Sequence, residues 1–446
     1  MTTDEPVIAE LTAANPIPET SPTAQERAEA ERILRRVLGD GPSRSPRRPR
    51  LGILAPVMSV LVVLVVAAVV LRTGGSVTTG SAPSGGLRIT LNALPSSQVP
   101  RITAGAMSRE IAVMRRRLAS LGRGFTVTQF GASGIVVAAP KARAADPARI
   151  VGLVTQSAQL FVYDWEANVL TPNGKTVASQ LLTQDQAALG ISQGGASGPG
   201  VPGAGGVPLY QAARRAANQP AAPAATTQSR KGSAYYVFGA PGSAACTAAA
   251  RLDGTTPVRG QHCLLNGPDP NLEDLYSGLP TGVTKSQGEL VTVPQGTVVL
   301  QAANLTASDQ IPPNSPAAQF FVLKDHVALT GNDITNPRPS ADQSGQPDVT
   351  FGFSGTGQNS FEKVTREITH RGAHVSLGGS MLNQHFAVAL DNQIVTVPQI
   401  DFRQYPDGII GGGGADVTGG FTHQSARDLA TELRYGALPL NVRVVP

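Results

Sequence analysis

The most apolar part of the chain is residues 51–71, which contain no charged side chain. At about 1.5 Å per helical residue, this segment is about 30 Å long, the hydrocarbon thickness of a bilayer. It exceeds the apolar part of a cleaved signal peptide, and a buried helix of a soluble core is rarely apolar on every side. Four arginines lie within residues 44–50, and only Arg72 follows closely. We therefore predict a transmembrane signal anchor with its N-terminus in the cytoplasm and the following residues outside the cell membrane.

Residues 72–86 form a linker rich in Gly, Ser and Thr. After it, apolar residues recur at the intervals that indicate helices and strands of an ordered domain. Five apolar side chains recur at helical intervals from Met107 to Leu121, and Gly122 is a typical C-terminal cap. A second helix is predicted over 146–156. Strands are predicted over 87–91, 125–130, 134–139 and 159–164. The order β-α-β-β-α-β is that of a ferredoxin-like unit, in which two helices cover one face of an antiparallel sheet.

Residues 187–229 interrupt this pattern with runs of Gly, Ala and Pro. They are predicted to form a low-complexity, mobile loop, because such a composition buries too little apolar surface to offset its conformational entropy. A β-rich segment over 230–318 follows. The block 319–446 alternates strands with helices, which indicates an α+β fold. Its predicted strands are 320–323, 349–353, 385–390, 393–397 and 441–445, and its predicted helices are 361–370 and 422–435.

Composition and charge refine this division of the chain. Residues 1–50 carry eight basic and eight acidic side chains and no aromatic one, so they are predicted to be a largely disordered cytoplasmic tail. Much of the excess in the 49 glycines and 35 prolines lies in this tail, the linker, the 187–229 loop and residues 411–420. The net charge of +5, without a basic stripe interleaved with aromatics, argues against nucleic-acid binding.

The only two cysteines, Cys246 and Cys263, are 17 residues apart. Both lie in the part expected outside the cytoplasm, where disulfides form and persist. A bridge between them is the favoured interpretation, and two buried free thiols are the alternative. A zinc site is disfavoured because only His262 lies nearby.

Motifs for catalysis or cofactor binding are weak. His370 and His374 have the i, i+4 spacing of metal ligands, but no third ligand follows at a recognisable distance, so a polar helix end is expected. Gly198, Gly200 and Gly203 match a dinucleotide-binding pattern by letters only, without a strand before them. The apolar segment has no ionisable residue for a proton path. We therefore predict no catalytic, metal or cofactor site, and a protein that is not an enzyme.

Short motifs in the last block follow one another in a recognisable order. Their residues are Leu329, Thr330, Gly331 and Asp333, then Asp391 and Pro398, then Gly419, Phe421 and Thr422, and finally Gly436, Ala437, Leu438 and Pro439. In this order they resemble the first extracytoplasmic (P1) region of the SecD family, whose members are accessory subunits of the bacterial protein-export translocase. The Gly-Ala-Leu-Pro motif closes that region in the family.

The resemblance implies a ferredoxin-like P1 base over residues 87–165 and an α+β head over 319–446 that returns to the base. It implies a single-pass protein of the bacterial cell membrane that assists protein translocation or secretion by binding exported polypeptide outside the membrane. Sec translocase subunits, such as a SecF-like protein, are the implied partners. An envelope scaffold or cell-wall-associated binding protein with the same fold is the alternative. The chain stops at Pro446, where a complete SecD re-enters the membrane, so proton-coupling helices are not expected.

Overall fold

The computed structural model describes most of the chain beyond the predicted anchor. The described residues are 80–81, 86–140, 146–182, 205–227, 229–302, 311–342, 345–376, 382–410, 414–418 and 421–445. The predicted tail, the predicted anchor and most of the linker lie outside this set. The chain divides into two units, 1–56 and 57–446, and every described residue belongs to the second. Within the described part, no helix has the length and apolar character needed to cross a bilayer.

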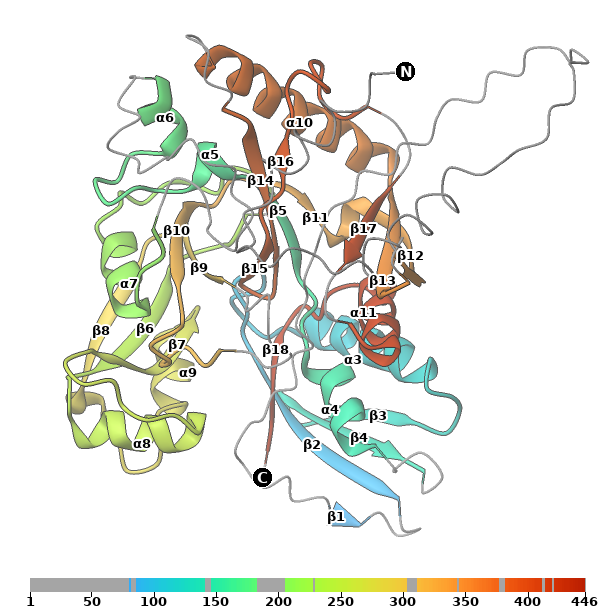
Figure 1. Ribbon diagram of the computed structural model, residues 1–446. Helices are drawn as coiled ribbons and strands as arrows, with labels where there is room; N and C mark the ends of the chain where they lie inside the picture. Colours follow the sequence, from blue (N-terminus) through green and yellow to red (C-terminus); the bar gives the residue numbers. More distant parts are fainter. Residues whose placement is uncertain are drawn as a thin grey trace, which may run out of the picture. The chain divides into compact units, whose positions relative to one another are not determined.

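The first sheet, here called the base sheet, has the ferredoxin-like strand order β18-β2-β4-β3. Helices α3 and α4 pack against it through a shared apolar core (Figure 1). Thr103 begins α3 because its hydroxyl accepts a hydrogen bond from Ala106 N. The bounds are β2 (Leu87–Leu94), α3 (Ala104–Ala119), β3 (Thr126–Phe130), β4 (Gly134–Ala139), α4 (Pro147–Thr155) and β18 (Asn441–Val444), and the short β1 (Gly80–Ser81) pairs with the start of β2.

The strand expected to close the base sheet belongs to another sheet. β5 (Leu160–Asp164) forms at the predicted place but lies between β14 and β11 of a seven-stranded sheet. All five of its residues are buried, with Leu160 and Val162 in one apolar cluster and Phe161 and Tyr163 in another. A strand that is apolar on both faces fits a sheet covered on both sides, whereas the base sheet has helices on one face. The prediction was therefore wrong about the partner of this strand, and β18 takes the fourth position.

The seven-stranded sheet is the centre of the second part of the fold, here called the head, which includes strands from residues 160 to 400. Its order is β10-β9-β15-β14-β5-β11, with β16 paired to β14. On one face it packs against α10 and a three-stranded sheet, β12-β13-β17, and on the other against α5 and α6. The bounds are α5 (Trp165–Asn168), α6 (Val177–Leu182), β9 (Thr297–Ala302), β10 (Phe320–Lys324), β11 (Val327–Thr330), β12 (Ile334–Ala341), β13 (Pro347–Phe353), β14 (Gln384–Leu390), β15 (Gln393–Thr396), β16 (Gln399–Ile400) and β17 (Ala415–Thr418).

Two long helices complete the head. α10 (Gly355–Val375) begins six residues before the predicted start at Phe361, because Ser354 caps it by accepting a hydrogen bond from Gly357 N. The first turn has few apolar residues, so the apolar spacing did not reveal it. α11 (His423–Tyr435) begins where it was predicted, capped by Thr422.

A smaller subdomain, which in sequence lies mostly between the base and the last block, has a three-stranded sheet, β7-β6-β8. The mobile loop predicted over 187–229 is wrong for residues 209–217, which form α7. Three of its four alanines, Ala212, Ala213 and Ala216, are fully buried, because small side chains let a helix pack closely. The bounds are α7 (Leu209–Ala217), β6 (Ala234–Gly239), α8 (Ala244–Asp253), β7 (Cys263–Asp269), α9 (Leu272–Ser277) and β8 (Gly288–Val293), with single 3₁₀ turns at Lys285–Gln287 and Gly331–Asp333.

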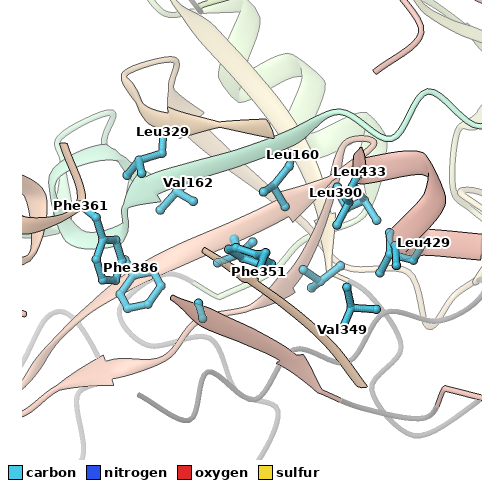
Figure 2. Close-up of a cluster of buried hydrophobic side chains, with 14 of the residues drawn as sticks. Leu160, Val162, Leu329, Val349, Phe351, Phe361, Phe386, Leu390, Leu429 and Leu433 are labelled. Atoms are coloured by element: carbon cyan, nitrogen blue, oxygen red, sulfur yellow. The ribbon is translucent and has the colours of Figure 1, made fainter. Parts of the chain in front are cut away.

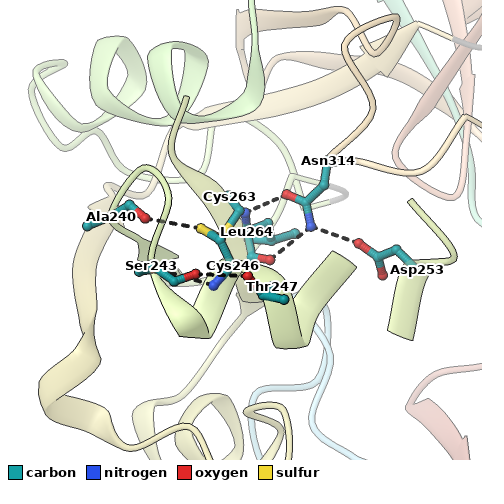
Figure 3. Close-up of a disulfide and its surroundings, with 8 residues drawn as sticks. All are labelled: Ala240, Ser243, Cys246, Thr247, Asp253, Cys263, Leu264 and Asn314. Carbon is teal, nitrogen blue, oxygen red and sulfur yellow. Dashed lines mark hydrogen bonds between the residues drawn. A yellow bond between two sulfur atoms is a disulfide. The ribbon is translucent and has the colours of Figure 1, made fainter. Parts of the chain in front are cut away.

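The two cysteines are bonded in this subdomain (Figure 3). Cys246 on α8 and Cys263 at the start of β7 have Cα atoms 5.6 Å apart. Gly239 faces both sulfur atoms so closely that a Cβ there would lie 2.9 Å from each. Asn314, which precedes β10, holds the backbone next to Cys263, because its Oδ1 accepts a hydrogen bond from Leu264 N at 2.6 Å.

Removal of this bridge is expected to destabilise the subdomain. The Cys246→Ala/Cys263→Ala variant should lose about 2–3 kcal/mol of unfolding free energy, because the cross-link restricts the unfolded chain. Urea unfolding, with and without a reductant, measures the effect. Reductant should destabilise the parent protein and leave the variant unchanged. Equal stability of the parent and the variant in the absence of reductant would contradict the prediction. So would two free thiols in the unreduced parent by mass spectrometry.

Candidate functional site

The chain passes between the base and the head at two places, which lie side by side. One is the connection from α4 to β5 over residues 156–159, and the other is the connection from α11 to β18 over residues 436–440. Leu438 N donates a hydrogen bond to Ser157 O at 2.9 Å. We call these two segments the junction, and the Gly-Ala-Leu-Pro motif forms most of its second segment.

One buried guanidinium joins both segments of the junction. Arg117 of α3 has no exposed surface. Its Nη1 donates to Leu153 O at 3.1 Å and to Gln156 O at 2.6 Å, while its Nη2 donates to Ser157 O at 3.2 Å and to Gly436 O at 2.8 Å. The side chain therefore holds the end of α4 and both crossing segments at once.

Carboxylates bind the backbone of the same two segments. Glu110 lies two turns before Arg117 on the same face of α3. It accepts a hydrogen bond from Leu440 N at 3.0 Å. Asp391, in the turn between β14 and β15, accepts from Ala158 N at 2.9 Å and from Gln159 N at 2.8 Å. Ala158 has a φ of 55°, a left-handed conformation that is unfavourable for alanine, so these bonds hold the crossing in an unusual backbone shape.

The junction contains more acidic than basic groups. Arg117 interacts electrostatically with Glu110, Asp391 and the buried Glu432 of α11. Burial raises the pKa of Glu110 to about 7 and that of Glu432 to about 8, and Arg117 partly opposes both shifts. Burial also raises the pKa of Asp391, although its two backbone hydrogen bonds oppose the shift. Because one cation cannot balance three ionised carboxylates in a buried site, protonation of at least one of them is favoured at neutral pH.

A salt bridge supports the junction at the surface. Arg149 of α4 binds the Asp428 carboxylate of α11 through Nε, at 3.1 Å from each oxygen, and through Nη2, at 2.8 Å from Oδ1. Both side chains are partly exposed, so this pair contributes less than a buried one. It nevertheless fixes the orientation of one base helix against one head helix, because bidentate arginine pairs are directional.

A second feature of the head is an apolar pocket between the seven-stranded sheet, α10 and β13, which is lined largely by the buried apolar cluster of Figure 2. The space inside it that water-sized molecules can occupy is about 30 Å³, and aromatic rings form much of its wall. The Phe353 and Phe361 rings stack with centroids 4.8 Å apart, and Phe386 meets Phe361 edge-on at 5.7 Å. Val162 and Leu329 complete the wall from β5 and β11. We call this space the apolar pocket.

The remaining motif residues serve local structure. Thr330 N donates to Asp333 Oδ2 at 2.8 Å across the turn that contains Gly331. Pro398 O accepts from Phe386 N, and Phe421 lies in the head core beside the cap residue Thr422. Ala437 is exposed, Pro439 O accepts from the Ser96 hydroxyl at 2.6 Å, and Gly419 lies outside the described residues.

His370 and His374 both lie on α10 with exposed side chains, and within the described ranges no group of three His, Cys, Asp or Glu residues is arranged to hold a metal. Gly198, Gly200 and Gly203 lie outside the described residues.

Asp391 of the junction was named as a motif residue, but Glu110, Arg117 and Glu432 were missed by the sequence analysis. A signal was present, because Glu110 and Arg117 fall on the apolar stripe of the helix predicted over 107–121, between Met107, Met114 and Leu118. A charged residue on such a stripe indicates a buried polar contact.

Comparison with known proteins identifies the region that contains the second junction segment. Residues 305–440 match the family model described as SecDF, P1 head subdomain. The protein translocase subunit SecD of Rickettsia typhi is 32% identical over 126 residues, which cover 28% of this chain and 21% of that protein. SecD of Synechocystis sp. is 37% identical over 127 residues, which cover 28% and 24%. The chain thus matches about a fifth to a quarter of the length of these relatives.

Two solved structures of SecDF resemble the chain more distantly. One, in the super-membrane-facing form, is 20% identical with a TM-score of 0.38, covering 81% of this chain and 30% of its own. Another, described as a membrane component that enhances protein export, is 19% identical with a TM-score of 0.37, covering 81% and 98%. The family match and the SecD relatives confirm the resemblance for the last part of the chain: residues 305–440 are similar to the P1 head subdomain of the SecD family.

Proposed function

We propose that this chain, whose residues 305–440 are similar to the P1 head subdomain of the SecD family, assists protein translocation by transiently binding exported polypeptide outside the cell membrane. Residues 51–71 would hold it there as a single span, with the N-terminus in the cytoplasm and Sec translocase subunits as neighbours. The observation that carries the proposal is the apolar pocket, because its lining residues on β11, β13, α10 and β14 lie inside the matched region, while Leu160 and Val162 of β5 precede it.

The pocket favours capture of side chains over capture of backbone. Its wall is apolar and its aromatic rings offer flat faces, so once the lining side chains move apart it would suit leucine, phenylalanine or methionine side chains of an unfolded chain in any sequence context. Backbone pairing at the neighbouring edge strand β12 is less suitable, because Pro337 and Pro339 have no N–H to donate. Binding through a few apolar side chains would be weak and reversible, as a translocating polypeptide requires.

The junction suits a protein that changes the position of its binding site. Two crossing segments connect the head to the base, and Arg117 binds backbone oxygens in both of them. We infer that this buried contact sets how firmly the head is held while polypeptide occupies the pocket.

Site-specific photocrosslinking tests the binding role. A photoreactive amino acid at Phe353, in the pocket wall, is expected to crosslink to a secretory polypeptide stalled during export. The same amino acid at Asn359, an exposed residue of α10, is the matched control and should react at least fivefold less. Replacement of the leucines in the stalled segment by serine should abolish the Phe353 product. Equal reaction at both positions, or capture of cell-wall assembly proteins alone, would support the envelope scaffold instead.

A further inference from the structure

Positive charge is concentrated in the base. The described residues 86–140 and 146–156 contain eight arginines and two acidic residues. The sequence from 157 to 446 contains 17 basic and 21 acidic residues, so its net charge is negative. The overall charge of +5 hides this asymmetry, which the sequence analysis did not consider. Charge asymmetry of this kind favours one orientation near a charged surface.

The fold gathers four of these arginines at one end of the base sheet. Leu87 pairs with Ala139, and Ala138 pairs with Thr126, so the start of β2, the end of β4 and the start of β3 meet at this end. α3 finishes there too, because its last residue is seven positions before β3. The arginines at this end are Arg88 on β2, Arg115 and Arg116 in the last turns of α3, and Arg123 between α3 and β3. We call them the linker-end arginines.

These side chains are available for a partner. All four residues are exposed, and within the described part of the chain no salt bridge joins them to a carboxylate. Arg115 alone has a fixed position, since its Nε and Nη2 donate to Val127 O at 3.2 and 2.6 Å. Arginine binds phosphate groups through two parallel hydrogen bonds, so Arg88, Arg116 and Arg123, which have no salt bridge or hydrogen bond among the described residues, favour a surface of phosphates.

The predicted membrane span precedes this end of the sheet in the sequence. β1 pairs Gly80 with Arg88, which places the incoming chain beside this arginine. Leu71, the last residue of the apolar segment, is nine residues before Gly80, so the two are at most about 30 Å apart. If residues 51–71 span the membrane, the short connection over residues 72–79 therefore limits how far the linker-end arginines lie from the bilayer surface.

We propose that the linker-end arginines dock the base on anionic lipid headgroups of the membrane that anchors the chain. This docking rests on the proposed anchor. The acidic remainder of the described chain is repelled by the same surface, so docking would orient the head and its apolar pocket away from the bilayer. The interaction is electrostatic and is therefore weakened by salt.

A fluorophore on the base measures docking in the full chain. Ala119→Cys places a label on the exposed side of α3 beside Arg116. The protein is reconstituted into vesicles of phosphatidylcholine alone or mixed with phosphatidylglycerol, each carrying a headgroup spin label that quenches nearby fluorophores. We expect strong quenching with phosphatidylglycerol only. It should disappear near 1 M salt, where the screening length is about 3 Å.

Matched charge variants show whether these arginines are responsible. Arg88→Gln/Arg116→Gln/Arg123→Gln should weaken docking by about fivefold per arginine, or about a hundredfold in total. The control Arg251→Gln/Arg403→Gln/Arg427→Gln removes the same charge from exposed positions elsewhere and should leave quenching unchanged. Quenching that is equal in the two lipids, or unaffected by the first variant, would overturn the proposal and leave these arginines to an acidic protein.

Vesicle flotation at high salt separates this proposal from the anchor. A chain that floats with every vesicle but shows no quenching specific to phosphatidylglycerol retains the anchor and refutes docking. A chain that is quenched by anionic vesicles and released by salt supports docking and refutes the anchor.

Discussion

Replacement of Arg117 by methionine is expected to lower the free energy of unfolding of the base by about 3–5 kcal/mol. Methionine has a similar length but cannot donate the four hydrogen bonds to Leu153, Gln156, Ser157 and Gly436. The variant would leave these carbonyl groups without their donor and the buried carboxyl groups without their cation. The loss should be largest where the two crossing segments meet, because Arg117 is the side chain that binds both.

Hydrogen exchange of backbone amides shows in which part of the fold the variant loses stability. Backbone amides of β2 and β18 should exchange about a hundredfold to a thousandfold faster in the variant, since each 1.4 kcal/mol is about a factor of ten. The fluorescence of Trp165, the only tryptophan, reports on the head and should change less. Arg116→Met is the matched control, because the neighbouring arginine is exposed and should change stability by less than about 0.5 kcal/mol. Equal exchange in the two variants would show that the buried guanidinium does not hold the junction.

A rise in pH from about 4.5 to 8 is expected to destabilise the junction by about 3–5 kcal/mol through Glu432. Burial raises the pKa of Glu432 from 4.5 to about 8, so the folded protein retains a proton that the unfolded chain releases. Stability is therefore greatest below the unfolded pKa of 4.5 and falls as the pH rises towards 8. Glu110 acts in the same direction over a narrower range, because its pKa is raised to about 7.

The surroundings of Glu432 explain the direction of this effect. Arg117 of α3 favours its ionised form, while Asp391 and Asp428 oppose ionisation, and the low polarity of the buried site has the largest influence. Arg149 binds Asp428 at the surface and reduces that repulsion. An acidic medium outside the membrane would therefore tighten the contact between base and head, and a neutral medium would loosen it.

The Glu432→Gln variant isolates this titration. Glutamine keeps the size of the side chain without the charge, so the variant should lose most of the pH dependence and should exceed the parent protein in stability near pH 8. Glu367→Gln, a change at an exposed residue of α10, is the control and should follow the parent. Urea unfolding at several pH values gives the slopes. A parent protein that becomes more stable between pH 5 and 8 would contradict the assignment.

The helices and strands of the base were predictable because their signals are local. The apolar stripe from Met107 to Leu121 led to α3, and the strands over 125–130 and 134–139 correspond to β3 and β4. The start of α10 was missed because its first turn lacks the apolar spacing that indicates a helix. Its first turn is stabilised by the Ser354 cap and contributes few apolar contacts, so the periodicity began only at Phe361.

The candidate site was less predictable than the elements that form it. Glu110, Arg117 and Glu432 come from two helices more than 300 residues apart in sequence, and Asp391 comes from a hairpin turn. Each helix could be predicted alone, but spacing along a helix does not reveal which buried carbonyl or carboxyl group a neighbouring helix supplies. Burial of these charges is therefore a property of the assembled junction.

The sequence by itself indicated the apolar segment at 51–71, most helices and strands of the base, the two long helices of the head and the motifs that resemble a SecD-type P1 region. Only the tertiary structure decided which strand completes the base sheet. Local patterns indicated β5, which follows α4 directly, yet both of its faces are apolar and need cover on two sides. β18 pairs with β2 from Asn441 opposite Leu94 onward, and Arg117 secures the crossing beside it. Strand pairing depends on which faces find apolar cover in the whole fold, and proximity along the chain does not decide it.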